Sequence, residues 1–199
     1  MGADKVDCGC YYLYKQNKHY LEGGGSMLKP AMLESLNRQI NLEFYSSNLY
    51  LQMASWCESQ GLDGCAAFMK GHANEEMQHM QRLFDYVNET GAMAKLGAVE
   101  APPTDFDSID DLFRQTYEHE QMITTKINEL ADTAFQEKDY STFNFLQWYV
   151  AEQHEEEALF KSVLDKIDLI GQEGKGLYFI DKEIGKLAVA TPAAADTAP

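Results

Sequence analysis

Residues 69–87, MKGHANEEMQHMQRLFDYV, hold the pattern that decides the fold. Side chains spaced alternately by three and four residues form one row along a helix: Met69, Ala73, Glu76, Met80, Leu83 and Val87. A row with this spacing marks the buried seam of a helix bundle. It is apolar except at Glu76, near its middle, and His79 lies one turn further on the same side. We therefore predict a long amphipathic helix that carries a buried carboxylate.

Three other stretches contain a row of the same kind. The rows are Leu36, Ile40, Glu43, Ser47, Tyr50 and Ala54; then Ile109, Phe113, Thr116, Glu120, Ile123, Ile127, Leu130 and Ala134; and finally Leu146, Tyr149, Gln153, Glu156, Phe160, Val163 and Ile167. Each row again has a carboxylate near its middle. Four such rows predict an all-α fold in which four helices pack around one core.

Local start and stop signals give the expected bounds of these helices. Pro30 suits a first helical position, Ser108 and Asp139 are good N-caps, and glycines follow the first two helices. We expect long helices over about 30–59, 63–90, 108–135 and 139–169, and a short fifth helix over about 176–187. Short turns join the first pair and the second pair. Residues 91–107 are long enough to cross the bundle, which predicts one long crossover.

The first 26 residues differ from the rest of the chain. Tyrosines crowd this stretch, and it ends in Gly23-Gly24-Gly25-Ser26, a composition typical of flexible linkers. Met27 then looks like a second start. We interpret residues 1–26 as an engineered peptide and linker, with a natural extension as the alternative, and residues 27–187 as the bundle domain. Residues 188–199 are small and polar and are expected to form a disordered tail.

The composition limits the possible functions. The chain has 32 acidic and 16 basic residues, a formal net charge of −16, which repels nucleic acid and attracts cations. No apolar run approaches the roughly 20 residues of a membrane helix. The N-terminus lacks the apolar core of a secretory signal. We expect a cytoplasmic protein that binds neither membranes nor nucleic acid, with Cys57 and Cys65 as small buried residues.

The four carboxylates of the rows are expected to meet, because antiparallel helices bring their middles to the same height. They are Glu43, Glu76, Glu120 and Glu156. A single such glutamate would ordinarily reach water at the edge of the core, but four buried carboxylates without a counter-charge are very unfavourable. The rows contain no Lys or Arg, so a pair of divalent cations is the simplest compensation.

The expected ligands restrict the metal and suggest roles for their neighbours. Carboxylates with one imidazole and no thiolate favour iron or manganese over zinc or copper. Gln153 lies one turn before Glu156. Tyr50 is either a redox-active neighbour of the metals or a core aromatic residue whose hydroxyl binds a carboxylate.

Several passages of residues 27–187 together resemble the bacterial non-haem ferritins. They are NLEFYSS at 41–47, EEMQHM at 75–80, FNFLQWY at 143–149, QHEEE at 153–157 and GLYFID at 176–181. The Glu76-x-x-His79 motif within the second passage is common to ferritin-like di-iron bundles in general, and is therefore not specific to the non-haem ferritins. The resemblance implies a ferritin-like four-helix bundle with one long crossover and a short fifth helix.

The same resemblance implies a di-iron site within each subunit. A first iron would be bound by Glu43, Glu76 and His79. Glu76 would bridge to a second iron, held also by Glu120 and Glu156. Such a site is a ferroxidase, which oxidises Fe(II) with O2 or peroxide. The family further implies a homo-oligomeric shell of 24 subunits around a ferric mineral, with the fifth helix lining channels.

The resemblance also assigns residues around the two irons. Gln153 would lie near the first iron, and Tyr50 matches the tyrosine beside the di-iron centre. The residues that match ligands of a third, inner iron site are Glu75, Glu152 and Glu155.

One departure separates this chain from the haem-containing bacterioferritins. Their di-iron sites use two Glu-x-x-His motifs, whereas the fourth helix here has Gln153-x-x-Glu156. Met77 lies where their haem-binding methionine would be, and we interpret it as a packing residue. No haem is therefore expected.

Two other functions are compatible with these patterns. A di-metal oxygenase or peroxide scavenger would need a substrate pocket and would store little iron. A structural cage that displays many copies of residues 1–26 would be multivalent and would not require iron chemistry.

Overall fold

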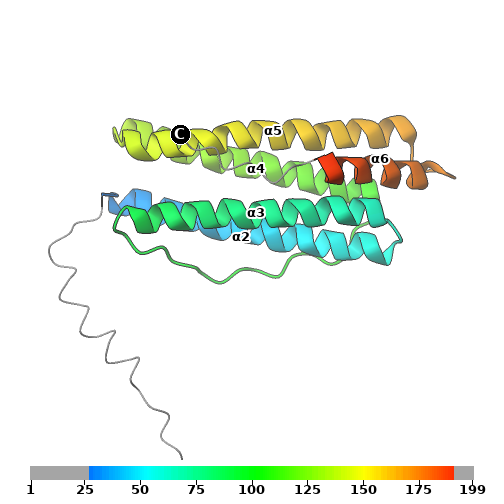
Figure 1. Ribbon diagram of the computed structural model, residues 1–199, viewed down its shortest axis with the longest axis horizontal. Coiled ribbons are helices and arrows are strands. Elements are labelled where there is room, and N and C mark those ends of the chain that lie inside the picture. Colours follow the sequence, from blue (N-terminus) through cyan, green and yellow to red (C-terminus); the bar gives the residue numbers. More distant parts are fainter. Residues whose placement is uncertain (1–26, 191–199) are drawn as a thin grey trace, which may run out of the picture.

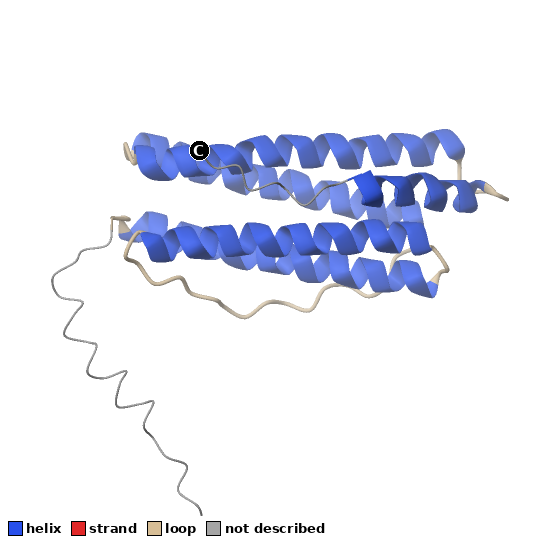
Figure 2. Cartoon of the chain, in the orientation of Figure 1, coloured by secondary structure: helices blue, strands red, loops and turns tan. Residues whose placement is uncertain are grey.

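The structure is a computed structural model that describes residues 27–190. The five helices are α2 (Pro30–Ser59), α3 (Asp63–Glu89), α4 (Ile109–Gln136), α5 (Tyr140–Ile170) and α6 (Gly176–Ala190). The described residues contain no strand, so the predicted all-α class is confirmed (Figure 2). The interpretation of residues 1–26 as an added peptide, and of 191–199 as a disordered tail, lies outside the described residues.

The four long helices form two antiparallel pairs, α2 with α3 and α4 with α5 (Figure 1). Each pair is joined by a short turn. Residues 91–107 instead run along the α2–α3 pair and return the chain to the opposite end (Figure 1). Asn41 fixes this crossover to α2: its Nδ2 donates to the Lys95 carbonyl oxygen at 3.2 Å, and its Oδ1 accepts from the Gly97 amide at 2.6 Å. The predicted topology with one long crossover is therefore present.

The predicted start and stop signals lie at the helix ends. The Ser108 side chain accepts a hydrogen bond from the Asp111 amide at 3.1 Å, and Asp139 accepts one from the Thr142 amide at 3.1 Å. Both bonds satisfy amide groups that the first turn of a helix leaves free. Gly61 follows the end of α2 with φ = 74°, a left-handed conformation that glycine adopts without strain.

The fifth helix extends through Ala190, three residues beyond the predicted end at residue 187. The prediction of a disordered tail starting at residue 188 is therefore wrong for 188–190. The physical reason is that Ala188, Val189 and Ala190 can continue a helix, and the first residue that stops one is Pro192. The helix packs against α3 and α5.

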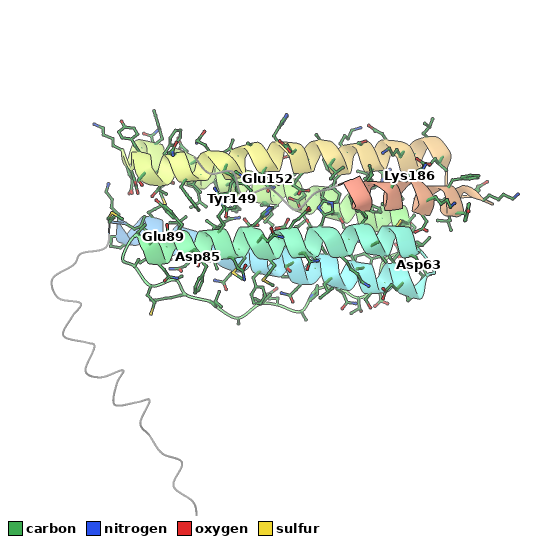
Figure 3. The ribbon with its side chains drawn as sticks, in the orientation of Figure 1. Asp63, Asp85, Glu89, Tyr149, Glu152 and Lys186 are labelled. Atoms are coloured by element: carbon green, nitrogen blue, oxygen red, sulfur yellow. The ribbon has the colours of Figure 1, made fainter. Side chains whose placement is uncertain are left out.

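Side chains occupy the space between the helices, and Tyr149, a member of the fourth row, is among them (Figure 3). Every residue predicted for a row is buried. The apolar members form two separate clusters, one around Tyr50, Phe113 and Phe160 and the other around Ile40, Leu83 and Ile127. The carboxylates of the rows lie between these two clusters, which places a buried polar layer at mid-height of the bundle. No helix within residues 27–190 is long and apolar enough to cross a membrane.

Candidate metal centre

Four glutamates, one from each long helix, form a buried carboxylate cluster. Glu43, Glu76, Glu120 and Glu156 are 1 %, 2 %, 1 % and 5 % exposed. Their charges act on one another: Glu76 interacts with Glu120 and Glu156, and also with Glu43. The structure thus brings together the four carboxylates that the row pattern predicted.

The first close set of possible metal ligands, here called the His79 group, consists of Glu43, Glu76 and His79. One ligand atom from each lies within 4.8 Å of the other two. His79 Nδ1 is 3.5 Å from Glu76 Oε2, and Gln39 Nε2 donates to Glu43 Oε1 at 2.8 Å. The other Glu43 oxygen and His79 Nδ1 are buried without a hydrogen-bond partner. Unpaired buried polar atoms are costly, so their convergence fits a cation between them.

Glu120 is the most strongly hydrogen-bonded member of the cluster. The Tyr50 hydroxyl donates to its Oε1, and Gln153 Nε2 donates to its Oε2 at 2.9 Å. Of the two roles considered for Tyr50, the structure shows the hydrogen bond to a carboxylate. Gln153, which the resemblance placed near the first iron, contacts a predicted ligand of the second.

A second close set, here called the His72 group, consists of His72, Glu75 and Glu156. His72 Nδ1 lies 3.1 Å from Glu75 Oε2 and 3.5 Å from Glu156 Oε2. The row pattern does not identify His72, because this residue lies beside the row, next to Ala73, and is not a member of it. A signal was present: His72-x-x-Glu75 has the same spacing, in reverse order, as Glu76-x-x-His79.

The three residues predicted for a third iron site are only partly assembled. Glu75 belongs to the His72 group. Glu152 is half-buried, with Oε1 3.9 Å from His79 Nε2, and lies in the middle stretch of α5 (Figure 3). Glu155 is exposed, although its charge acts on Glu152. Among the described residues, ligand atoms gather closely in the His79 and His72 groups and not around Glu155.

Burial and mutual repulsion raise the pKa of three carboxyl groups of the cluster, those of Glu43, Glu76 and Glu120. Burial, and then the charge of Glu76, raises the pKa of Glu43 to about 8. Burial, and then Glu156, raises the pKa of Glu120 to about 7. The pKa of Glu76 is raised well above its usual value, chiefly by burial and by Glu120. Glu43, Glu76 and Glu120 therefore bind protons near neutral pH, and a divalent cation can replace these protons.

The donor atoms of the two groups indicate the class of cation that would fit. They are carboxylate oxygens and two imidazole nitrogens, which suit Fe(II) or Mn(II). Cys57 and Cys65 are buried, as predicted, and belong to neither group. Burial raises the pKa of the Cys57 thiol to about 12, so it stays protonated.

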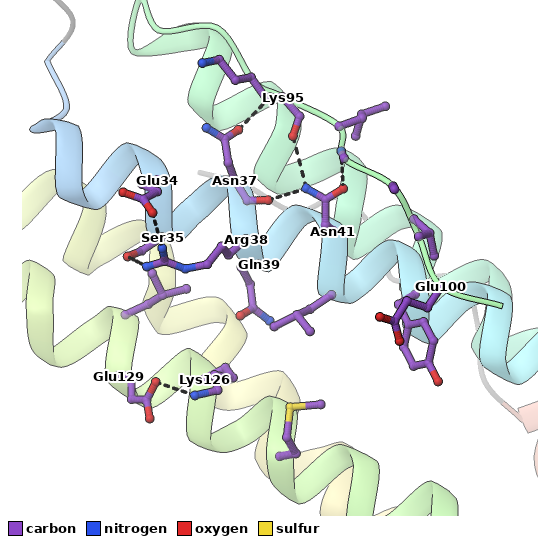
Figure 4. Close-up of a pocket in the computed structure, with 18 of the residues that line it drawn as sticks. Glu34, Ser35, Asn37, Arg38, Gln39, Asn41, Lys95, Glu100, Lys126 and Glu129 are labelled. Carbon is purple, nitrogen blue, oxygen red and sulfur yellow. Dashed lines mark hydrogen bonds and ion pairs between the residues drawn. The ribbon is translucent and has the colours of Figure 1, made fainter. Parts of the chain in front are cut away.

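A pocket of about 1330 Å³ opens on the outside of the bundle between α2, residues 95–100 and α4 (Figure 4). Two of its lining residues also contact the site. Gln39 donates to Glu43, and His119 lies against the Tyr50 ring at 5.9 Å between centroids, with Nε2 2.8 Å from Ser46 Oγ. Burial lowers the pKa of His119 to about 4, so its imidazole is uncharged at neutral pH. The pocket is thus lined by Gln39 and His119, which contact residues of the site, and by none of the four carboxylates of the cluster.

Comparisons with known proteins identify relatives of this chain. A family model described as a ferritin-like domain matches residues 33–170. A bacterial non-heme ferritin of Escherichia coli O157:H7 is 60 % identical over 161 residues, which cover 81 % of this chain and 98 % of the relative. One of Campylobacter jejuni is 52 % identical over 164 residues, or 82 % of this chain and 98 % of the relative.

Solved structures of ferritins are also similar to this chain. An open pore ferritin of the archaeon Archaeoglobus fulgidus superposes with a TM-score of 0.77 at 49 % identity, and the match covers 79 % of this chain and 98 % of that one. A Chlorobium tepidum ferritin superposes with a TM-score of 0.72 at 52 % identity, covering 80 % and 98 %. Similarity at this level extends over nearly the whole length of each relative.

Proposed function

The chain belongs to the ferritin family, and from this premise we propose that it is an iron-storage subunit that oxidises Fe(II) at its buried carboxylate cluster. The relatives named as bacterial non-heme ferritins support storage as the function. The His79 group carries the proposal for this chain, because its three buried side chains each offer a ligand atom within 4.8 Å of the others, and two buried atoms of the group have no hydrogen-bond partner.

In this proposal Fe(II) and the oxidant are both substrates. The negative charge of the chain favours the approach of Fe(II). Two Fe(II) ions displace the protons held by the cluster, and each loses one electron. O2 takes up these two electrons and two protons and leaves as hydrogen peroxide. Where hydrogen peroxide is the oxidant, it takes up the two electrons and two protons and leaves as two water molecules. The ferric product then moves on to be stored as mineral.

The residues of this chain have separate tasks. Glu43, Glu76 and His79 bind the first iron. Tyr50 and Gln153 hold the Glu120 carboxylate in place by donating to its two oxygens. Burial raises the pKa of Tyr50 well above its usual value, so its hydroxyl remains a donor during turnover.

We further propose that the subunits form a hollow homo-oligomeric shell, of 24 copies as the family resemblance implies, in the cytoplasm. The exposed apolar side chains of α6 and of the end of α5 support association with other copies. They are Leu169, Leu177, Tyr178 and Phe179. Exposed apolar residues gathered in one region are typical of association surfaces.

The test is to add Fe(II) in steps to metal-free protein in air, and to follow ferric absorbance and the iron retained per chain. Rapid oxidation with many irons retained per chain is expected. Oxidation that stops near two irons per chain would favour an oxygenase-like relative. An intact shell that does not oxidise iron would favour a display cage.

A single substitution sharpens this test. Glu76→Ala removes the carboxylate shared by both proposed iron positions, and we expect fast oxidation to fall at least about 100-fold while the helical content is kept. Glu89→Ala is the matched control, because Glu89 is an exposed glutamate of the same helix. If Glu76→Ala oxidises iron as fast as Glu89→Ala, the carboxylate cluster is not the oxidation site.

A further inference from the structure

A glutamine of α2 is buried beside the carboxylate cluster and has no task in the proposed reaction. Gln39 is 2 % exposed, although glutamine is ordinarily a surface residue. It lies four residues before Glu43, so the two side chains meet on one side of the helix. Burying an amide is unfavourable unless the amide is hydrogen-bonded, and an apolar side chain would serve packing alone at least as well. The partner of the amide therefore indicates what Gln39 does.

The partner of this amide is a proposed ligand of the first iron. Gln39 Nε2 donates to Glu43 Oε1 at 2.8 Å, within the core. The other oxygen of this carboxylate, Oε2, is buried without a hydrogen-bond partner. Glu43 also offers a ligand atom within 4.8 Å of those of Glu76 and His79. The amide thus occupies one oxygen of Glu43 and leaves the other oxygen for a cation.

This hydrogen bond fixes a torsion that the fold leaves loose. The last torsion of a glutamate side chain has broad energy wells, so burial of the stem does not set the plane of the carboxylate. Hydrogen bonds from residues behind the metal ligands commonly set such planes. Glu120 has a donor for each oxygen, from Tyr50 and Gln153. Glu43 accepts from Gln39 at one oxygen while the other is unpaired, so its orientation depends on this single donor.

The position of Gln39 also determines how its role can be tested. Its side chain lines the outer pocket between α2, residues 95–100 and α4 (Figure 4). The amide therefore lies between this pocket and Glu43. A substitution by alanine would remove the donor and also thin the wall of the pocket. A substitution by leucine keeps a side chain of similar size and removes the donor alone.

We propose that Gln39 is a positioning residue for iron oxidation, which holds the Glu43 carboxylate so that its Oε2 faces the first Fe(II). Gln39 acts through Glu43 and does not contact the ion. This inference rests on the proposed function, because it adds a residue to that reaction. The carboxylate must have this orientation before the ion arrives. Loss of the hydrogen bond is therefore expected to weaken Fe(II) binding more than it slows oxidation in the filled site.

The test compares Gln39→Leu with Gln52→Leu as the matched control. Gln52 is on the same helix, nine residues after Glu43, and nine residues are two and a half turns, so it lies on the opposite side of α2. Initial rates of oxidation at increasing Fe(II) concentration give KM and kcat separately. Calorimetry with Co(II), added without oxygen to metal-free protein, measures binding independently of oxidation. The visible absorption of Co(II) responds to the arrangement of its ligands, and thermal melts report folding.

We expect Gln39→Leu to raise the KM for Fe(II) about 10- to 100-fold, and to weaken the tightest Co(II) binding by a similar factor. Its kcat should fall less than about threefold, because the filled site keeps its metal ligands. The Co(II) absorption of this variant should differ from that of the unsubstituted protein. Gln52→Leu should match the unsubstituted protein in KM, Co(II) affinity and absorption.

A crystal structure of the unsubstituted protein with Co(II) tests the geometry without any variant. We expect Co(II) on Glu43 Oε2, with the Gln39 amide still bonded to Oε1. Co(II) bound through Oε1, with the Gln39 amide turned away, would overturn the role of Gln39 even if the variant did not fold.

The contrary results separate this inference from the proposed function. Equal KM and equal Co(II) affinity in the two variants would overturn the role of Gln39 and leave iron oxidation standing, and so would a fall in kcat at unchanged KM. A lower melting temperature alone would show only a packing role, and would overturn it as well. If the unsubstituted protein binds Co(II) but does not oxidise Fe(II), the proposed function fails, and the Co(II) affinities of the variants still decide whether Gln39 positions Glu43. If it binds no Co(II), both proposals are overturned.

Discussion

At the scale of single residues, the buried carboxyl group of Glu43 lowers the stability of the metal-free fold when it must ionise. Its carboxylate is fully buried, and its pKa is raised to about 8 by burial and by Glu76. A group whose folded pKa lies above its unfolded value stabilises the fold below the unfolded pKa, and this contribution is lost as the pH rises to the folded pKa. Metal-free protein should therefore lose stability from this group between about pH 4.5 and pH 8.

The first prediction removes this titration with Glu43→Gln. In the presence of a chelator, the melting temperature of the variant minus that of the unsubstituted protein should increase from about pH 5 to about pH 8 by at least about 3 °C, because glutamine cannot ionise in the core. Thermal melts followed by circular dichroism measure it. Glu89→Gln, at an exposed position, serves as the control. A difference that does not change with pH would show that Glu43 does not retain its proton in the fold.

Helix α6 shows, at the scale of elements, that a close backbone contact can decide where a helix lies. A Cβ on Gly185 would be 2.9 Å from the Gly64 Cα, and a Cβ on Gly64 would collide with the Asp181 carbonyl oxygen. Asp181 Oδ1 also accepts a hydrogen bond from the Cys65 amide at 2.9 Å. Two glycines thus allow α6 to approach the first turn of α3 closely, and Asp181 satisfies an amide that this turn leaves free.

The second prediction concerns this contact. Gly185→Ala places a methyl group where the two backbones meet, and we expect it to destabilise the chain by about 1–3 kcal/mol. Gly71→Ala is the matched control, because a Cβ there meets nothing within 4 Å, and alanine in a helix interior should be neutral or stabilising. Thermal melts of both variants decide the matter. If Gly185→Ala melts at the same temperature as Gly71→Ala, α6 can move to accommodate the methyl group without any loss of stability.

The charge of the chain acts at the scale of the whole molecule. With a formal net charge of −16, the protein attracts cations from solution, while the carboxylate cluster binds them locally. The two effects differ in their response to salt. Screening at about 0.15 M salt shortens the reach of the surface charge to about 8 Å, but buried pairs are screened much less.

The third prediction follows from this difference. Raising the salt concentration from about 0.01 M to about 0.15 M should lower the initial rate of Fe(II) oxidation several-fold at limiting Fe(II), and should change the number of irons bound per chain little. Stopped-flow absorbance measures the rate, and potassium and sodium chlorides compared at equal ionic strength control for specific ions. A rate independent of salt would show that the surface charge does not assist uptake.

The sequence by itself determined the helices and their buried faces. The alternation of three- and four-residue spacing identifies one side of each helix, and all residues of the four rows are buried. Capping residues and glycines fixed most helix ends, whereas α6 lacked a stop signal before Pro192 and was predicted too short. The four glutamates could be placed at one height because antiparallel helices of similar length must align their middles.

Only the tertiary structure decided which polar atoms meet. It directs Gln153 to Glu120, leaves Glu155 exposed, and brings His72 against Glu156 of another helix. Periodicity specifies the buried side of a helix, but contact across a bundle depends on the rotation and height of each helix to within about an ångström, which the packing of all the side chains sets together. For the same reason, the spacing of Gly64 and Gly185 in the sequence does not reveal that their backbones meet where α6 packs on α3.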